Sequence, residues 1–585
     1  MTDLVELEIL NSRLQAIAEE AQFTLERSAH SPSIREGADC STGLFDSAGN
    51  MVAQATAIPV HLGSLEAAVA GLLAHFPVAS MSDGDVYIMN DPYSGGQHYP
   101  DIIMLTPVMF DRAVVALHCS LGHHQDIGGI APGGNPTNAT ETFQEGLCIP
   151  PVKLFDRGVL NTAIRSILRG NVRIPDVVWG DVEAQIAAAH VASRRLLHLL
   201  DVIGPSAFQH GVTELQDMSE ELTRRVIAAI PDGTYRFDDY LDNDGVELDK
   251  LVRIEVAVTV SGSDVFVDFT GTDPQVRGPI NAVPSVALSA VRYVLRCVTG
   301  ADVPHNSGCF RMIDISIPEG TLLNPIAPAA VSCRAVTLRR VVDAMIGALA
   351  QALPDVVPAA SSGHPFSQRL GGRGSTGGAW VTSVIGTGGM GARPGLDGID
   401  AIQTDASNSQ NIPIEYLETY LPFHVLEFGL RPDSCGAGEY RGGLGLVMKY
   451  RILEDGVILT HRGERFFTRP WGLCGGRPAQ SSEAYVRRAD GTMEKILSKG
   501  IFTLRRMDEV EVLSAGGGGR GDPFRRDPHA VERDVRQGKV TAESARSIYG
   551  VEIIPETGAV DPAATSSLRS NASAAHVPSV ADVAR

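Results

Sequence analysis

The sequence predicts a mixed α/β (α+β) protein of several subdomains, with large β-sheets and a mostly helical middle segment. With 585 residues, the chain is too long for one compact hydrophobic core. Short apolar segments bounded by turn residues recur in the first third of the chain and again between residues 410 and 515, which is typical of strands. Between residues 182 and 230, alanine and leucine recur instead at helical spacing.

Shifts in composition divide the chain into six expected regions. They are an N-terminal α/β region (residues 1–180), a helical segment (181–230), a β-rich and then helical region (231–370), a glycine-rich loop with a β-rich region (371–527), a C-terminal helical unit (528–554) and a tail (555–585). The tail is rich in Ala, Ser, Thr and Pro, and such a composition buries too little apolar surface to fold. We therefore expect the tail to be disordered.

The first elements follow from local patterns. Asp3 and Glu6 resemble a capping box, and the leucines that follow recur at helical spacing, which predicts an amphipathic helix over residues 4–27. Residues 40–60 are typical of a β-hairpin around a Ser-Ala-Gly-Asn turn, and residues 65–76 of a helix.

Three strands are expected next, and the third is an almost continuous apolar run of the kind buried on both faces. They cover residues 85–89, 102–110 and 114–119. The helical middle segment is followed by alternating segments that predict an antiparallel sheet, and then by further helices. The helices are expected over residues 182–202, 212–230, 283–299 and 335–353.

Residues 370–398 are rich in glycine and contain a G-x-G-x-x-G pattern at Gly386, Gly388 and Gly391. A dinucleotide site needs a helix to begin at this pattern, but Ala-Arg-Pro-Gly follows, which is a poor start for one. The pattern therefore favours an ordered loop at an active site or interface. The sequence also lacks the G-x-x-x-x-G-K-[ST] phosphate-binding motif.

Charge and composition exclude several classes of partner. The formal net charge of −20 disfavours binding to nucleic acid or to an anionic membrane surface. We find no apolar stretch of about 18 residues and no signal-peptide pattern at the N-terminus, so neither a membrane span nor export is expected. The 8 cysteines are scattered without a C-x-x-C pair, which favours reduced thiols in a cytoplasmic protein.

Reactive side chains concentrate between residues 90 and 130. This segment contains His98-x-x-Asp101 and His123-His124-x-Asp126, and most of the residues between the two groups are strand-like. Two imidazoles and a carboxylate brought together suit a catalytic divalent metal with open coordination positions. The alternatives are a metal-free acid/base site or a hydrogen-bonded cluster in the core.

Two adjacent histidines in a strand point to opposite sides. Only one of His123 and His124 is therefore expected to join His98 and Asp101, and the spacing does not say which. The other histidine, together with His118 or Asp126, is expected to support the ligands or to face the substrate.

Further candidates lie outside this segment. Glu145 is a candidate general base and Lys153 a candidate electrostatic stabiliser, although a solvated loop is the alternative for each. Asp39 and His61 flank the first hairpin and are candidates to line the same pocket. A G-x-S-x-G elbow is missing from the sequence, which disfavours a nucleophilic serine.

Nine segments, in order along residues 4–554, resemble the hydantoinase B/oxoprolinase family. They are SIREGADCSTGLFDSAGNMVAQA, IPVHLGSL, NDPYSGGQHYPD, GHHQDIGG, ETFQEGLCIPPVKL, VDFTGTDPQVRGPIN, NSGCFR, RPDSCGAGEYRGGLG and the end GGGGRGDP…GKVTAESARSIYGV. The resemblance implies one component of an ATP-dependent system. Its partner is a hydantoinase A-like subunit with an actin-like ATPase fold, which holds ATP and Mg and phosphorylates the substrate.

The same resemblance implies a substrate class and an assembly. Members of the family open cyclic amides such as hydantoins, 5-oxoproline and caprolactam. Other members are subunits of acetone or acetophenone carboxylases, which is the alternative function. A heterodimer, a heterotetramer or a larger heteromer with the ATPase subunit is expected.

The resemblance also selects the ligands of one divalent ion. In the carboxylase relatives a His-x-x-Asp pair and a later histidine hold manganese, and the matching residues are His98, Asp101 and His123. Manganese, zinc and iron all accept such ligands. His124, Asp126 and Glu145 are then the candidate proton carriers. Gln97 and Tyr99 flank His98 where relatives commonly carry Thr and Leu, a departure that reshapes the expected pocket.

Overall fold

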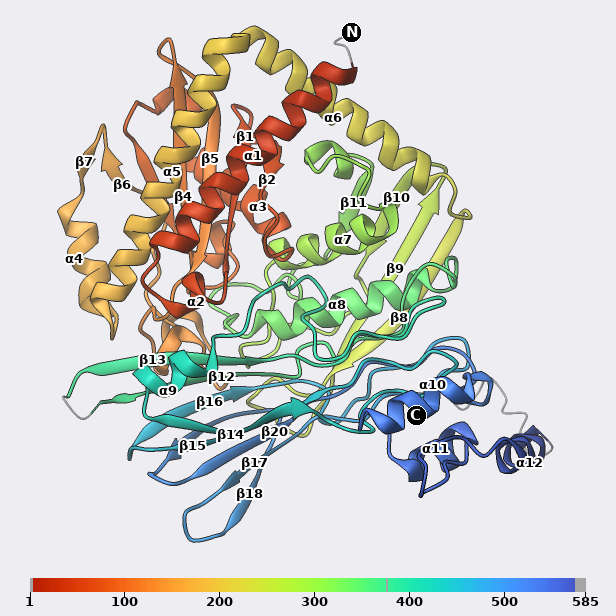
Figure 1. Ribbon diagram of the computed structural model, residues 1–585. Helices are drawn as coiled ribbons and strands as arrows, with labels where there is room; N and C mark the ends of the chain where they lie inside the picture. The colour runs from red at the N-terminus through yellow and green to blue at the C-terminus, as the bar shows by residue number, and fades with distance from the viewer. Residues whose placement is uncertain (1–3, 375–376, 574–585) are drawn as a thin grey trace.

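The computed structural model describes residues 4–374 and 377–573, and it is an α/β assembly of layers around four sheets (Figure 1). The first sheet has seven strands in the order β2-β1-β5-β4-β3-β6-β7, with every neighbouring pair antiparallel. Its strands are β1 (Cys40–Asp46), β2 (Met51–Gln54), β3 (Val86–Met89), β4 (Asp101–Phe110), β5 (Ala113–His123), β6 (Val152–Asp156) and β7 (Val159–Leu160).

Helices cover both faces of this first sheet. On one face, α1 and α5 pack through leucines such as Leu14 and Leu196, and on the other face α3 packs Leu65 and Leu72 against the strands (Figure 1). The central strands are buried on both sides, which explains why β5 is apolar almost throughout. The helices of this half are α1 (Leu4–Ser28), α2 (Pro32–Arg35), α3 (His61–His75), α4 (Thr162–Asn171), α5 (Pro175–Ile203) and α6 (Pro205–Ile227).

The second sheet has the order β11-β10-β9-β8 and shares a large hydrophobic core with two helices, α7 (Pro284–Thr299) and α8 (Arg334–Leu349). Its strands are β8 (Gly233–Leu241), β9 (Val252–Ser261), β10 (Asp264–Asp268) and β11 (Ile313–Ser316). The pair β10–β11 is parallel and the other pairs are antiparallel. The first turn of α8 lies close to the end of the first sheet where β4 begins, which becomes important for the site.

Two further sheets form the C-terminal layer and share one core. Their orders are β13-β12-β16-β19 and β14-β15-β20-β17-β18. The strands are β12 (Phe366–Arg373), β13 (Ala379–Gly386), β14 (Phe423–Leu430), β15 (Leu446–Ile452), β16 (Val457–Arg462), β17 (Glu483–Arg487), β18 (Met493–Ile496), β19 (Lys499–Leu504) and β20 (Glu509–Leu513). The helices of this layer are α9 (Ile414–Tyr420), α10 (Pro528–Arg536), α11 (Ala542–Tyr549) and α12 (Pro562–Ser573).

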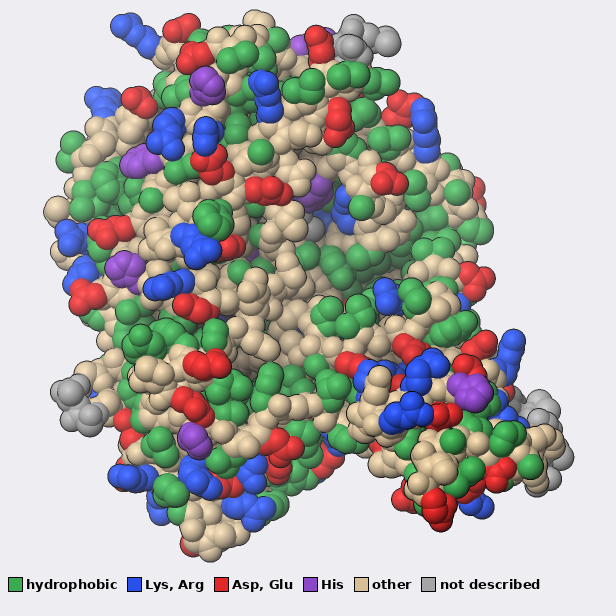
Figure 2. All heavy atoms as spheres, in the orientation of Figure 1, with side chains coloured by type: hydrophobic (Ala, Val, Ile, Leu, Met, Phe, Trp, Pro, Cys, Tyr) green, Lys and Arg blue, Asp and Glu red, His purple; other side chains and the backbone are tan. Residues whose placement is uncertain are grey.

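Short 3-10 helices connect several of these elements. They are η1 (Val78–Ser80), η2 (Pro92–Ser94), η3 (Pro132–Gly134), η4 (Thr142–Gln144), η5 (Ser307–Phe310) and η6 (Pro523–Arg525). None of the helices in the described ranges is both long enough and apolar enough to cross a bilayer. Figure 2 shows cationic and anionic side chains interspersed over the visible face, without a continuous basic area.

The predicted fold class is confirmed, and so are most of the predicted elements. The first helix spans Leu4–Ser28, close to the predicted 4–27. Several boundaries were misplaced: the first hairpin ends at Gln54, the next helix begins at His61 instead of residue 65, and α5 and α6 begin at Pro175 and Pro205 instead of residues 182 and 212. The prediction of disorder from residue 555 was wrong over Pro562–Ser573, which form α12, and residues 574–585 lie outside the described part.

The glycine-rich segments pack backbone against backbone. A Cβ at Gly389 would lie 1.9 Å from the carbonyl oxygen of Gly443, and one at Gly391 would lie 1.8 Å from that of Ala359. Residues 387–413 contain no helix. The glycines of the G-x-G-x-x-G pattern therefore allow loops to pack closely against one another. The helix that a dinucleotide site requires is not formed there.

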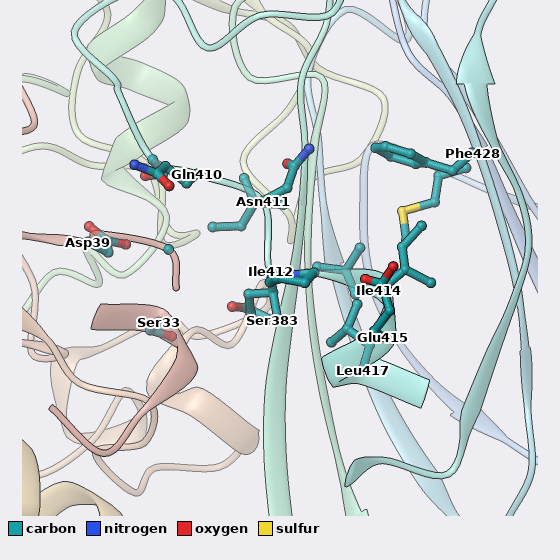
Figure 3. A pocket seen from close by; sticks show the side chains of 16 residues that line it. Ser33, Asp39, Ser383, Gln410, Asn411, Ile412, Ile414, Glu415, Leu417 and Phe428 are labelled. Atoms are coloured by element: carbon teal, nitrogen blue, oxygen red, sulfur yellow. The ribbon is translucent and has the colours of Figure 1, made fainter. Parts of the chain in front are cut away.

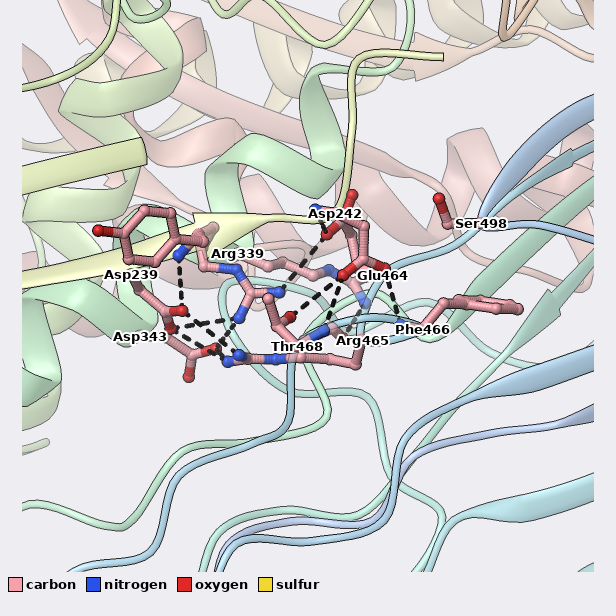
Figure 4. Close-up of polar contacts among 12 residues, drawn as sticks. Asp239, Asp242, Arg339, Asp343, Glu464, Arg465, Phe466, Thr468 and Ser498 are labelled. Carbon is pink, nitrogen blue, oxygen red and sulfur yellow. Dashed lines mark hydrogen bonds and ion pairs between the residues drawn. The ribbon is translucent and has the colours of Figure 1, made fainter. Parts of the chain in front are cut away.

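A buried ionic network joins the second sheet to the C-terminal layer (Figure 4). Arg465, which follows β16, places one guanidinium nitrogen 2.6 Å from Asp343 of α8 and 3.2 Å from Asp239 of β8. Arg340 reaches Asp239 at 3.2 Å, and Glu464 accepts from Lys499 at 2.5 Å. Because these charges are removed from water, each depends on its partner for stabilisation.

We expect Arg465→Met to lower the free energy of unfolding by about 3–5 kcal/mol, because Asp343 and Asp239 would lose a buried counter-charge. Chemical denaturation of the purified chain measures this change. Arg225→Met is the control, since Arg225 pairs with Glu221 at the surface, where an ion pair contributes about 0–1 kcal/mol. Equal effects of the two substitutions would contradict a structural role for the network.

Candidate metal centre

The predicted ligands meet because β4 and β5 are neighbouring antiparallel strands. Asp101 begins β4, His123 ends β5, and the two residues are direct partners in the ladder. His98 lies in the turn before β4, where its carbonyl oxygen accepts a hydrogen bond from the Asp101 backbone N–H at 3.1 Å. The sheet thus gathers three side chains from two separate sequence motifs.

The three side chains form a tight, buried cluster. His98 Nε2 lies 3.0 Å and His123 Nδ1 2.9 Å from the same oxygen, Oδ1 of Asp101. The candidate ligand atoms all lie within 4.8 Å of one another. Two ligands that bind one ion at about 2.0–2.2 Å stand roughly 3 Å apart, so this spacing fits a shared divalent ion.

The imidazole of His98 is oriented by a backbone carbonyl group on the side away from Asp101. Its Nδ1 lies 3.3 Å from the carbonyl oxygen of Ser332, an arrangement that places the proton on Nδ1 and leaves the lone pair of Nε2 free. Although Nε2 lies close to Asp101, the contact lacks hydrogen-bond geometry, and Nε2 has no other partner among the described residues. A buried nitrogen in this state is suited to metal ligation.

Asp101 is held as a carboxylate. Burial raises its pKa, but His98, Arg334 and His123 more than offset this effect and hold the pKa well below its usual range. Arg334, the first residue of α8, donates to Oδ2 at 2.6 Å. This contact directs the other oxygen, Oδ1, toward the two histidines.

Both histidines are neutral imidazoles, the form that binds metals. Burial lowers the pKa of His98 to about 4, and it lowers that of His123 to about 4 as well. The Nε2 of His123 accepts a hydrogen bond from a guanidinium nitrogen of Arg369 at 2.6 Å, which places the imidazole proton on Nδ1, toward Asp101. An ion bound at Nδ1 would displace this proton. The donor set of two imidazoles and one carboxylate therefore fits a divalent ion with positions left open.

His124 points away from this cluster, as expected for its place next to His123 in the chain. Its Nε2 lies 3.0 Å from the side-chain oxygen of Gln185 in α5. Burial lowers its pKa, and its Nδ1 has no partner among the described residues. The structure thus brings His123, rather than His124, to His98 and Asp101.

Asp126 anchors the loop that follows β5. Its two carboxylate oxygens accept from the backbone N–H of Gly133 at 2.9 Å and of Arg173 at 2.7 Å, and Arg173 also forms an ion pair with it at 3.0 Å. These contacts occupy both oxygens. A role in proton transfer remains a prediction.

Glu145 supports His98 indirectly. One of its oxygens accepts from the backbone N–H groups of Val331 at 2.9 Å and Ser332 at 2.7 Å, and Ser332 in turn holds His98. Burial raises the pKa of Glu145 to about 8, although these two hydrogen bonds oppose the shift. Lys153 instead pairs with Asp85 and Asp156 at 2.9 and 3.0 Å, away from the cluster.

Several residues of the site were not identified from the sequence. Arg334, Arg369 and Ser332 each contact a candidate ligand from a segment more than 200 positions away in the chain. Asp39, which was only a candidate for lining the pocket, lies half-buried beside the cluster, and its carbonyl oxygen accepts from the His123 N–H at 2.9 Å. Nothing local marks the three distant residues, because only the packing of layers brings them there.

A cavity of about 260 Å³ is lined by Asp39, although none of the three donors lines it. Figure 3 shows it between the segment that carries Ser33 and Asp39 and the C-terminal sheets, with Ser383 of β13 at its centre. Ser383 is the cross-strand partner of Arg369. The far end of the cavity is apolar, and it is lined by Ile412, Ile414, Leu417, Phe428 and Met448.

Comparison with known proteins identifies the family. The profile of the hydantoinase B/oxoprolinase family matches residues 3–523. The chain belongs to this family. It is 32% identical to a putative D-/L-hydantoinase component, the B subunit, of a Pseudomonas species, strain NS671, over 94% of this chain and 95% of that protein. It is also 32% identical to the beta chain of the caprolactamase of Pseudomonas jessenii, over 96% and 98%.

Two solved structures have the same fold. The ATP-dependent caprolactamase from Pseudomonas jessenii superposes with a TM-score of 0.89 at 30% identity, covering 97% of this chain and all of the matched chain (100%). A nucleotide-free acetone carboxylase superposes with a TM-score of 0.90 over 98% of this chain and 84% of the matched one. At 21% identity, the second comparison establishes the shared fold alone.

We expect Glu145→Ala to weaken metal binding by about 10–100-fold, the usual effect of removing a residue that orients a ligand. The change would release the Val331–Ser332 backbone that holds His98. Glu145→Gln is the matched control, because its side-chain oxygen still accepts both N–H groups. Metal titration of the two purified variants measures the difference, and equal affinities would contradict the positioning role.

Proposed function

We propose that this chain is the metal-binding catalytic subunit of a two-component, ATP-dependent hydrolase of cyclic amides such as hydantoins, 5-oxoproline or lactams. The observation that carries the proposal is the buried donor set of His98, Asp101 and His123 in a member of the hydantoinase B/oxoprolinase family. Relatives that match over nearly their whole length are named as subunits of a hydantoinase and a caprolactamase.

The proposed ion is manganese, zinc or iron, since mixed nitrogen and oxygen ligands accept all three. When bound, such an ion supplies Lewis acidity that polarises an oxygen of the substrate and activates water. The chain's own residues hold the site ready: Ser332 fixes the tautomer of His98, and Arg334 fixes the orientation of Asp101. Burial of all three donors excludes bulk water.

Of the proposed proton carriers, Glu145 has the pKa best matched to neutral pH, at about 8, and one of its oxygens has no hydrogen-bond partner among the described residues. His124 and Asp126 are proposed in the same role, but their contacts with Gln185 and Arg173 make them less available. Glu145 is therefore our first choice.

The proposal includes a partner, a hydantoinase A-like ATPase that holds ATP and Mg and activates the amide by phosphorylation. The support is that relatives are named as subunits, that the sequence lacks a phosphate-binding motif and that its G-x-G-x-x-G segment forms no helix. A heterodimer or heterotetramer is the proposed assembly, with a cytoplasmic location.

We expect Asp101→Ala and His123→Ala to abolish metal binding, because each removes one of three ligands. His124→Gln should keep the metal, since His124 faces α5 instead of the cluster. Elemental analysis of the purified proteins is the measurement, with circular dichroism as a check on folding. Metal loss on His124→Gln, but not on His123→Ala, would reverse the assignment.

We expect the isolated chain to hydrolyse neither ATP nor a cyclic amide, and the mixture with its ATPase partner to do both. The reason is that a stable amide resists attack until it is activated, and this chain has no recognised nucleotide site. Assays with a panel of hydantoins and lactams, with and without bicarbonate, test this. ATP-dependent turnover by the lone chain would contradict the two-component proposal, and bicarbonate-dependent turnover of a ketone would replace it with a carboxylase.

A further inference from the structure

Three arginines near the metal cluster are buried without a direct ion pair, although Asp39, Asp101 and Asp405 lie near enough to act on their charges. The side chains of Arg339, Arg369 and Arg462 belong to residues that are 6%, 3% and 6% exposed. Within the described residues, none of them lies within 4.0 Å of a carboxylate oxygen. Other buried arginines are paired, for example Arg334 with Asp101 and Arg465 with Asp343.

Burial of an unpaired charge is strongly unfavourable, so proteins pair buried charges or bind a ligand to them. Arg462 donates to the neutral oxygens of Asn135 and Ser332, both at 3.1 Å, and Arg339 to those of Gly363 and Gln403, both at 3.0 Å. These contacts satisfy some donors but do not neutralise the charge.

Arg369 and Arg462 lie on the same face of neighbouring strands. In the β12–β16 ladder, Arg462 is opposite Ser367, two residues before Arg369, and side chains two apart in a strand share a face. That face is turned to the metal cluster. Arg369 contacts His123 itself, and Arg462 contacts the Ser332 carbonyl oxygen that also orients His98.

Several buried nitrogens in this group have no hydrogen-bond partner among the described residues. They include Nε and Nη1 of Arg369, Nε of Arg462 and both ring nitrogens of His364. His364 stands just before β12 and next to Glu464, whose N–H donates to its carbonyl oxygen at 2.9 Å. Burial and the nearby charges of Arg339, Arg462, Lys499 and Arg334 hold the pKa of His364 well below its usual range, which reflects how cationic this space is.

We propose that Arg369, Arg462 and His364 form an oxyanion site beside the metal centre, with Arg339 adding positive charge, and that it takes the phosphoryl group of a phosphorylated substrate. This inference rests on the proposed function, because that function supplies such a substrate. Two forked guanidinium groups and an imidazole match a tetrahedral dianion, which needs many donors and two compensating charges. A carboxylate brings one charge and two oxygens, and it would leave more of the positive charge unpaired.

The site would place the phosphoryl group within the reach of side chains that also touch the metal ligands. Arg369 links the two sites directly, since its guanidinium group contacts His123. A phosphorylated amide held in this way has its reacting end beside the metal centre, and unphosphorylated substrate lacks the anion that the site needs. The phosphoryl group that the partner adds to activate the substrate would then also be the group by which this chain recognises it.

The test is calorimetric titration of the full-length chain with inorganic phosphate and, separately, with acetate. We expect phosphate to bind, acetate to bind at least about tenfold more weakly, and Arg462→Gln to weaken phosphate binding by about tenfold or more. Arg373→Gln is the matched control, because Arg373 ends the same strand β12 but is exposed to solvent. It should leave phosphate affinity unchanged.

Arg462→Lys, which keeps the charge, should retain more phosphate affinity than Arg462→Gln, and metal content in each variant verifies that the neighbouring centre has folded. Equal phosphate affinity in wild type and both Arg462 variants would overturn the site, and so would acetate binding as tight as phosphate binding. The titration requires neither the partner nor a cyclic amide. A chain that binds phosphate through Arg462 but fails in the amide assays would support this site and contradict only the proposed function.

Discussion

The register of the β4–β5 hairpin is the constraint on which the candidate metal centre depends. The strands turn at Asp111 and Arg112, both with positive φ, as a two-residue hairpin turn requires. A bulge that leaves Val115 unpaired then shifts the ladder by one residue. As a result Asp101 is paired with His123, whereas an unbroken ladder would pair it with Gly122. A slip of one residue also turns each side chain to the other face, so the bulge decides which histidine meets the carboxylate.

The centre is completed by layers that come from distant parts of the chain. Asp101 receives Arg334 from the start of α8, and His123 receives Arg369 from β12. The strands of the first sheet, with the turn before β4, thus supply the candidate metal ligands, while α8 and β12 supply the arginines around them. The ionic network of Arg465, Asp239 and Asp343 holds the same layers together, which links the stability of the fold to the geometry of the site.

Burial sets the chemistry of these groups. The same desolvation that keeps His98 and His123 neutral raises the pKa of Glu145 and leaves the charge of Arg462 without water. In a low-dielectric space, a small excess of positive charge is a strong attraction for an anion. Desolvation therefore has two effects: it makes the three donors suitable for a metal ion, and it makes the surrounding arginines suitable for an oxyanion.

The sequence by itself determined the fold class, most helices and strands, and the two motifs that meet at the centre, because hydrophobic period and turn residues are local properties. It also pointed to His98 and Asp101, whose types and spacing are informative alone. Local patterns left His123 and His124 unresolved, since their difference depends on the unpaired Val115. The roles of Arg334, Arg369 and Arg462 were decided only by the tertiary structure, because packing alone brings these distant arginines to the centre and removes them from water.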